Sequence, residues 1–352
     1  MRLTFPILLL AGSAAAQTRP PIRLVLLHTI EDRPGLSLGA IQRFALGPDG
    51  GVVAFDGGNG VIYRFTPTGT LRDSLGHKGQ GPGEFLVAAG LAVGPAGEVA
   101  LADLRTRRFT VWEADGTLRG STQLAGMPVD LLWSGSAPVA GVVSFGGTVM
   151  IRFGPVRLGE TGLGPPIGEF PDPRITEYAT ALSCGTCRHA LTPDGRLLVA
   201  APDTFYRVTE LDATGPVVRT WRRSDVGAGL RTEEELTALR NRLAAGPGGG
   251  RPLPGMEARF HAPGDEALKY RPRFQGIGID DKGRLLALVS SAGSTRPVLD
   301  VFGADGRLLG SVPLQRDFQA MTVRGNRMAA LSETAEGTPA ILVFRIETVP
   351  PQ

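Results

Sequence analysis

The amino-acid sequence predicts an all-β protein: a six-bladed β-propeller that is closed by an N-terminal strand in its last blade and carries one short helical insertion. Three observations predict this fold. Strand-and-turn units recur at nearly constant spacing, Gly occupies the corresponding turns, and the last unit lacks a strand that the N-terminus can supply. The chain has 352 residues, of which 42% are hydrophobic, which is enough for a large buried core.

The first two units keep the same register along their whole length. The first-turn glycines Gly50 and Gly97 are 47 residues apart, and the second-turn glycines Gly69 and Gly116 have the same spacing. Gly suits these positions because a tight hairpin needs a positive φ. Similar turns recur later in the chain, at Thr192–Gly195, Thr214–Gly215, Asp280–Gly283 and Asp305–Gly306.

Two units are weaker and are argued from spacing. Gly97 and Gly195 are 98 residues apart, which leaves room for one blade between them. The last unit ends after Ile341–Phe344, whereas Ile22–His28 precedes the first blade and has no partner there. Pairing these two strands closes the ring and removes exposed sheet edges. The predicted blades are residues 44–76, 91–123, 129–166, 189–221, 276–312, and 321–346 joined by 22–31.

The N-terminus has the pattern of an export signal. Arg2 precedes the apolar stretch Phe5–Ala11, and the small residues Ala14–Ala16 follow it. We therefore expect residues 1–16 to be a signal peptide and residues 17–352 to be the propeller, periplasmic or secreted. No later stretch is long and apolar enough to span a bilayer, so no integral membrane segment is expected after cleavage. We expect a monomer.

The charge pattern does not favour nucleic acid as a partner. The formal net charge is +3, but the cations are mostly Arg scattered among acids, with no polybasic run. A groove for nucleic acid combines clustered cations with interleaved aromatic residues. Aromatic residues make up only 6% of this chain, and several lie at core-like strand positions.

Residues 76–123 resemble the NHL-repeat propellers. The resemblance rests on Gly79–Phe85, then Leu91–Val93, Val99–Asp103 and Arg108–Trp112. The chain is most similar to the exported bacterial six-bladed propellers of that broad superfamily. It departs from the repeat pattern at Thr106, where Asn is usual, and around Ala88–Ala89, where Pro is usual. The resemblance implies a platform for recognition, although a few relatives are lyases or hydrolases.

The geometry of a four-stranded blade predicts which face carries function. Tight Gly turns share one face, and the connections between blades share the other face with the loops between second and third strands. Most of the long segments belong to this second face, where a rigid scaffold can display loops for binding. Seven polar residues there are the candidate binding residues: His77, Lys78, Gln80, Glu84, Arg105, Arg107 and Arg108.

The longest segment on that face is an insertion over residues 222–275, between blades four and five. Residues 232–243 are predicted to form a short amphipathic helix, because Thr232 and Glu235 have capping-box spacing and three leucines recur on one side. The rest is rich in Pro and Gly. A lid over a ligand and a helix that only packs on the propeller fit this pattern equally.

Cys184 and Cys187 are the only cysteines, and after export we expect them to form a local disulfide. A redox-active pair needs a strand-to-helix setting that a connection between blades does not provide. A haem attachment motif needs His directly after the second Cys, where Arg188 stands. Zinc bound through both cysteines and His189 lacks an evident fourth ligand, so no metal site is expected.

No catalytic set is evident, so we expect an exported scaffold that recognises a protein, peptide or carbohydrate and needs no cofactor. The alternative is a metal-dependent hydrolase, as in propeller lactonases, or a lyase, with its site at the central channel. Glu84, Asp56 and Asp103 are its candidate carboxylates. Turn roles explain Asp56 and Asp103 more simply, because each follows a strand where Asp can accept hydrogen bonds from backbone N–H groups.

Overall fold

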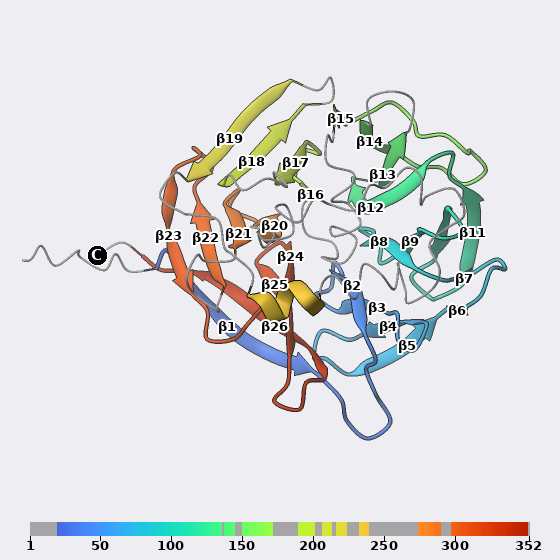
Figure 1. Cartoon of the computed structure of the whole chain (residues 1–352), viewed down its shortest axis with the longest axis horizontal. Helices are drawn as coiled ribbons and strands as arrows, with labels where there is room; N and C mark the ends of the chain where they lie inside the picture. Colours follow the sequence, from blue (N-terminus) through green and yellow to red (C-terminus); the bar gives the residue numbers. More distant parts are fainter. Residues whose placement is uncertain are drawn as a thin grey trace, which may run out of the picture.

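The computed structural model describes residues 20–135, 137–144, 150–171, 189–200, 206–212, 216–223, 232–238, 274–289 and 297–350. Six four-stranded antiparallel sheets surround a central axis (Figure 1). The chain is therefore a six-bladed β-propeller, as the sequence predicts. The first strands of neighbouring blades contact one another, so these strands form the inner ring. In the last blade, β24 takes this inner position.

The strands of the first three blades follow each other along the chain. Blade one contains β2 (Ile41–Leu46), β3 (Val52–Asp56), β4 (Val61–Phe65) and β5 (Leu71–Leu75). Blade two contains β8 (Ala88–Val93), β9 (Val99–Asp103), β10 (Arg108–Trp112) and β11 (Leu118–Gln123). Blade three contains β12 (Met127–Ser134), β13 (Ala137–Ser144), β14 (Met150–Pro155) and β15 (Gly168–Pro171).

The remaining blades complete the ring. Blade four contains β16 (His189–Leu191), β17 (Leu197–Ala200), β18 (Tyr206–Leu211) and β19 (Val217–Arg223). Blade five contains β20 (Phe274–Ile279), β21 (Leu285–Val289), β22 (Val298–Phe302) and β23 (Leu308–Pro313). Blade six contains β24 (Ala320–Arg324), β25 (Arg327–Glu333), β26 (Pro339–Thr348) and β1 (Ile22–Ile30). A short parallel ribbon, β6 (His77–Lys78) and β7 (Glu84–Phe85), lies between blades one and two.

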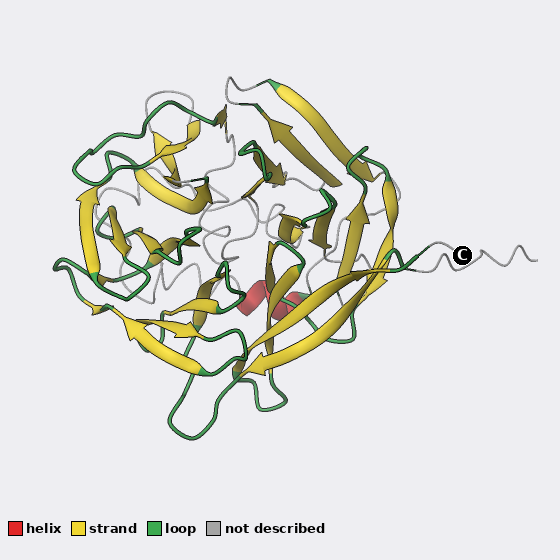
Figure 2. Cartoon of the chain, turned by 180° about the vertical axis from the view of Figure 1, so that it is seen from behind, coloured by secondary structure: helices red, strands yellow, loops and turns green. Residues whose placement is uncertain are grey.

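The predicted closure by the N-terminal strand is confirmed. β1 pairs with β26 in antiparallel register, from Ile22 opposite Thr348 to Ile30 opposite Ile341, with one irregularity between Leu26 and His28. The sheet order of blade six is β1-β26-β25-β24, so the first strand of the chain is the outermost strand of the last blade. Figure 2 shows both strands crossing the lower edge of the ring side by side.

The predicted Gly turns also hold. First-turn glycines have a positive φ in blades one, two, four and five, which are Gly50, Gly97, Gly195 and Gly283. Second-turn glycines behave in the same way at Gly69, Gly116 and Gly306. Residues with a side chain rarely adopt this conformation, so Gly permits each hairpin to reverse in a few residues. Blade three turns more tightly, at Gly135, which the spacing argument did not locate.

Two glycines of the inner ring serve a different purpose, because they let neighbouring blades approach. A Cβ on Gly90 would lie 2.2 Å from the Leu131 backbone nitrogen of the next blade, and one on Gly276 would lie 2.4 Å from the Met321 Cγ. Each of these glycines follows an irregularity in the pairing of its strand. Any other residue would push adjacent blades apart.

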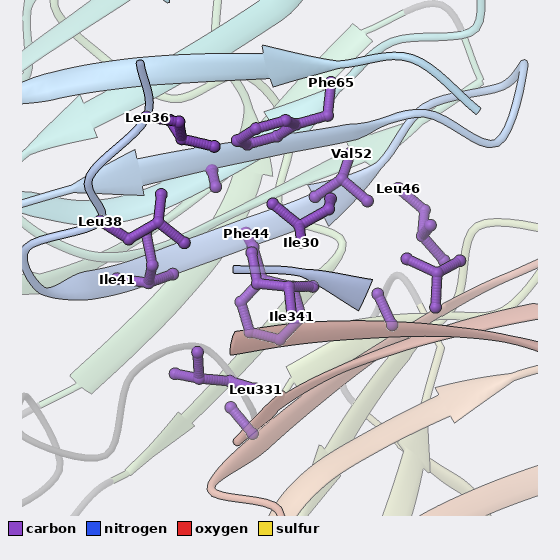
Figure 3. Close-up of a cluster of buried hydrophobic side chains, with 14 residues drawn as sticks. Ile30, Leu36, Leu38, Ile41, Phe44, Leu46, Val52, Phe65, Leu331 and Ile341 are labelled. Atoms are coloured by element: carbon purple, nitrogen blue, oxygen red, sulfur yellow. The ribbon is translucent and has the colours of Figure 1, made fainter. Parts of the chain in front are cut away.

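Apolar side chains fill the space between blades. Figure 3 shows the cluster between blades six and one, where Ile30 and Ile341 pack near Phe44 and Val52. These four side chains are at most 4% exposed. The closing strand thus contributes to the core as well as to the sheet.

The predicted helix of the insertion is confirmed at its N-terminal end. Residues 233–238 are helical, the Glu235 N–H donates to Thr232 Oγ1 at 3.3 Å, and the Thr232 N–H donates to Glu235 Oε2 at 2.8 Å, which is a capping box. Leu236 is 3% exposed. The two views place this helix in front of blade six in Figure 1 and behind it in Figure 2, so it covers one face of the ring.

Several predictions lie outside the described residues. They are the signal peptide over residues 1–16, the greater part of the insertion 222–275, the turn at Thr214–Gly215, and both cysteines, Cys184 and Cys187. Among the described residues, no helix has the length and apolar character needed to cross a membrane.

Candidate functional site

The connection between blades one and two contains four of the seven candidate residues and is folded around one buried aromatic side chain. Phe85, only 1% exposed, meets Phe55 edge-on with ring centroids 5.3 Å apart and Trp112 at 6.3 Å. This anchor fixes the β6–β7 ribbon, in which His77 is paired with Glu84 and Lys78 with Phe85. Lys78 is exposed.

Glu84 organises the tip of this connection. One carboxylate oxygen accepts a hydrogen bond from the Gly81 N–H at 2.6 Å, and the other lies 2.9 Å from His77 Nε2. The Gly81 hydrogen bond lowers the pKa of Glu84 most; desolvation raises it, and the His77 contact lowers it further. Glu84 is therefore a structural carboxylate of the loop and does not line the axial cavity.

Arg108 ties the same loop to blade two. Its Nη1 donates to the carbonyl oxygens of Gln80 and Gly81, at 2.6 Å each. Arg108 begins β10, so the rigid sheet fixes the guanidinium and the guanidinium fixes the loop. Gln80 contributes its backbone to this contact, and its residue as a whole is exposed.

Arg105 and Arg107 lie in the neighbouring β9–β10 loop. Arg107 is exposed and has a φ of 52°, the one positive φ among the described non-Gly residues. Such a conformation stores backbone strain of roughly 1–3 kcal/mol, which the surrounding loop must hold. Arg105 is partly buried, and its Nη1 has no hydrogen-bond partner among the described residues. Each of the two candidate loops thus carries an exposed cation, Lys78 in one and Arg107 in the other.

Asp56 and Asp103 have the turn roles that the sequence suggests. Asp56 accepts from the N–H groups of Gly39, Ala40, Gly58 and Asn59 at 2.7–3.0 Å. Asp103 accepts from those of Leu86, Val87, Arg105 and Thr106. Both are at most 1% exposed. Each carboxylate therefore joins the incoming connection of its blade to the loop between the second and third strands.

This surface is built from polar side chains of two neighbouring connections. We use the name loop-face cluster for the exposed or partly exposed polar residues of the two connections, which are His77, Lys78, Gln80, Glu84, Arg105, Arg107 and Arg108. The single carboxylate of the cluster is occupied by Gly81 and His77. Exposed cations on a rigid base suit acidic or hydroxyl-rich ligands.

Sequence reasoning missed a second polar feature, a buried acid–base pair on the inner ring. His189 Nδ1 of β16 lies 3.0 Å from Asp130 Oδ2 of β12, and the two residues are 9% and 4% exposed. The His189 ring also lies 4.8 Å from that of Phe153. A signal was present in the sequence: Asp130 interrupts an otherwise apolar inner strand, where a charge costs free energy unless it is paired.

An axial cavity of about 430 Å³ lies beside this pair, and inner strands of all six blades line it. Its lining combines apolar and polar groups, and its titratable residues among those described are Asp130, His189 and Arg324. Pro95, Pro193 and other first-turn residues belong to the lining, so the cavity reaches the face with the tight turns.

The described residues do not assemble a metal site. No group of three or more His, Cys, Asp or Glu side chains gathers among them. The candidate carboxylates Asp56 and Asp103 are held by backbone N–H groups, and they do not line the axial cavity. His189, considered as a zinc ligand with the two cysteines, faces Asp130.

No family model matches the chain, and no curated protein matches it. Many solved structures do. The WD40 repeats of RRP9 superpose with a TM-score of 0.54 at 13% identity, covering 92% of this chain and 100% of that one. At that identity the likeness shows the fold alone: the chain is a β-propeller.

Two further solved structures match the chain less closely. Virginiamycin B lyase from Staphylococcus aureus has a TM-score of 0.46 and 12% identity, with 86% of this chain and 79% of that one covered. BamB from Moraxella catarrhalis has a TM-score of 0.39 and 13% identity, covering 92% and 100%.

Proposed function

We propose that this protein is an exported, monomeric binding scaffold of the NHL-like type that recognises a protein, peptide or carbohydrate through the face with the long connections. The observation that supports it most is the construction of the loop-face cluster. Phe85 anchors its ribbon, Arg108 holds its tip, and Asp103 joins it to the next loop, while cationic groups stay accessible. Pre-organised loops lose little conformational entropy on binding.

The charge of the cluster narrows the ligand. Lys78 and Arg107 are exposed, and His77 has a side chain that is 74% exposed, so the surface offers hydrogen-bond donors and positive charge. A ligand with carboxylates or a dense set of hydroxyl groups complements it. A folded partner with an acidic patch, an acidic peptide and an acidic polysaccharide share this chemistry.

Photo-crosslinking tests which face binds. A photoreactive amino acid is placed at Lys78 on the loop-bearing face or, as a matched control, at Lys282 in a first turn on the opposite face, where the residue is also exposed. Illumination in the native envelope fraction should give one discrete adduct from position 78 and none from position 282. The same adduct from position 282 alone would contradict the proposal.

A hydrolase or lyase with its site at the central channel is the second candidate. The buried pair Asp130–His189 favours it, because a carboxylate at Nδ1 orients the imidazole and fixes its tautomer. Metal analysis of the purified protein tests the metal-dependent form. Stoichiometric Ca²⁺ or Zn²⁺ that is lost in His189→Ala would support that form, and metal-free protein would count against it.

A further inference from the structure

Blades one and two fold the loop between their second and third strands in the same way. Asp56 and Asp103 each accept hydrogen bonds from the N–H groups two and three positions later, at 2.7–3.0 Å. In both loops, the residue directly after the aspartate donates its N–H to a carbonyl oxygen of the incoming connection, at 2.8 Å. The two loops therefore correspond residue by residue, with an offset of 47 positions that is the same as for the turn glycines.

Arg107 occupies the position that Gly60 holds in blade one, because the two residues are also 47 positions apart. Gly60 has a φ of 68° and Arg107 a φ of 52°, so the loop requires the left-handed conformation at this position in both blades. Glycine adopts this conformation freely, whereas a residue with a side chain is strained in it. Folding alone therefore favours glycine at position 107.

The Arg107 side chain makes no contact that would offset this strain. The Arg107 carbonyl oxygen accepts from the Leu124 N–H at 2.7 Å, but a glycine would supply the same carbonyl group. Within the described part of the chain, the guanidinium makes no hydrogen bond and no ion pair, and the residue is exposed. Strained residues of this kind cluster at functional positions.

Lys78 supplies a cation at the matching place in blade one. A Cβ on Gly60 would lie 3.0 Å from the Lys78 Cβ, and Lys78 Cγ and Cδ would both lie at 3.7 Å. The stem of Lys78 thus lies over Gly60, where a side chain of residue 60 would begin. Neighbouring blades therefore each present one exposed cation at the same loop position, one from the β6–β7 ribbon and one from the loop itself.

The ligand of this pair of cations is held by charge more than by stacking. Aromatic rings contribute much of the apolar contact in interfaces, but Phe55, Phe85 and Trp112, which anchor this connection, are at most 3% exposed. These rings offer no platform for a sugar ring. A guanidinium binds a carboxylate through two parallel hydrogen bonds, and an ammonium binds one as a point charge. Successive acidic side chains of a peptide supply carboxylates for both.

We propose that Arg107 determines the specificity of the loop-face cluster by binding a carboxylate of an acidic peptide segment in the partner, and that Lys78 binds a second carboxylate of the same segment. This inference rests on the proposed function, because it names the ligand chemistry of the same face. Arg107 thus favours binding, whereas glycine at the same position would favour folding.

Labelled hexaglutamate is the probe for this chemistry. Fluorescein-labelled hexaglutamate is titrated with the folded protein at low ionic strength, and fluorescence anisotropy is recorded. Hexaglutamine is the uncharged control, and hexagalacturonate is an acidic saccharide with the same number of carboxylates. We expect saturable binding of hexaglutamate that added salt weakens, no binding of hexaglutamine, and weaker binding of hexagalacturonate. Tighter binding of hexagalacturonate than of hexaglutamate would overturn the assignment to a peptide.

Substitutions at position 107 separate binding from folding. Arg107→Gly should weaken hexaglutamate by about tenfold or more, while its urea midpoint of unfolding is no lower than that of the wild type. Arg107→Lys keeps the charge and should weaken binding by less than about threefold. Arg307→Gln, which removes an 86% exposed guanidinium from the opposite face, should match the wild type. Unchanged hexaglutamate affinity in Arg107→Gly, or a lower urea midpoint, would overturn the proposal.

The photo-crosslink at position 78 distinguishes a failure of this inference from a failure of the proposed function. A discrete adduct from position 78 in a protein that does not bind hexaglutamate would overturn the acidic peptide and leave the binding face intact. An adduct from position 282 alone would overturn the binding face and this inference together.

Discussion

Ile30 of β1 lies directly opposite Ile341 of β26, and neither side chain is exposed to solvent. This pair joins the two ends of the chain in one sheet and packs into the cluster between blades six and one (Figure 3). The ring therefore depends on a contact that a local repeat cannot make. It can close only when the last blade is complete.

Replacing this pair should destabilise the whole ring. Ile341→Ala removes a fully buried side chain and should lower the free energy of unfolding by about 2–5 kcal/mol. Leu26→Ala, on the same closing strand but 51% exposed, should cost less than about 1 kcal/mol. Urea unfolding followed by circular dichroism compares the two. Similar losses would show that the closing strand is not part of the cooperative core.

The buried turn carboxylates make a second prediction. Asp103→Asn keeps the size of the side chain but places an amide NH₂ near four backbone N–H donors. The substitution should therefore lower the free energy of unfolding by about 2–4 kcal/mol. Asp305→Asn is the control, because that carboxylate is 60% exposed, accepts a hydrogen bond from the Arg307 N–H at 3.1 Å and lies 3.8 Å from the Arg307 Nε. Thermal unfolding measures both. A loss at Asp103 no larger than that at Asp305 would contradict the capping role.

These turn roles could be predicted from the sequence because they act over a few residues. Gly50 and Gly97 mark hairpins by themselves, and Asp56 and Asp103 cap turns whose N–H groups lie two or three positions away. The closing strand could also be predicted, since an apolar strand without a neighbour must find one. The turn residues and the need to pair the N-terminal strand were thus enough to predict the architecture.

The inner ring could not be predicted in the same way. Asp130 and His189 are 59 positions apart on different blades, and they meet because the inner strands converge on the axis. An irregularity between Pro128 and Asp130 changes the pairing just before the carboxylate. The repeat pattern does not specify such irregularities. The loop-face residues could be named from the sequence as candidates, but the hydrogen bonds of Glu84 and Arg108 could be assigned only from the fold.

The stability of the ring should fall with acid through His28 of the closing strand. Desolvation, then the Arg327 guanidinium, lowers the pKa of His28 below its ordinary value of about 6.5. The folded state then binds fewer protons than the unfolded state, so stability decreases as pH falls below about 6.5 and levels off below the folded pKa.

The pH dependence is measured by urea unfolding between pH 8 and pH 5, in the wild type and in His28→Phe. In His28→Phe, the free energy of unfolding should decrease less between pH 8 and pH 5 than it does in the wild type. His77→Phe is the control, because the His77 side chain is 74% exposed. An identical pH dependence in the wild type and His28→Phe would show that His28 does not contribute.

Arg108 should govern the order of the loop-face cluster. Arg108→Gln removes the guanidinium that holds the Gln80 and Gly81 carbonyl oxygens, so hydrogen exchange at the amides of Gly79 and Glu84 should accelerate by about tenfold or more. Arg107→Asn tolerates the positive φ and should leave these rates unchanged. Equal exchange in both variants would contradict the anchoring role.

The central claim is that the face with the long connections binds the partner, and matched charge reversals test it most directly. Lys78→Glu with Arg107→Glu changes the loop-bearing face, and Lys282→Glu with Arg307→Glu makes the same change in net charge on exposed residues of the opposite face. The account predicts that the first pair abolishes capture of the crosslinked partner from the native envelope fraction and that the second pair retains it. Retention by the first pair and loss by the second would contradict the claim.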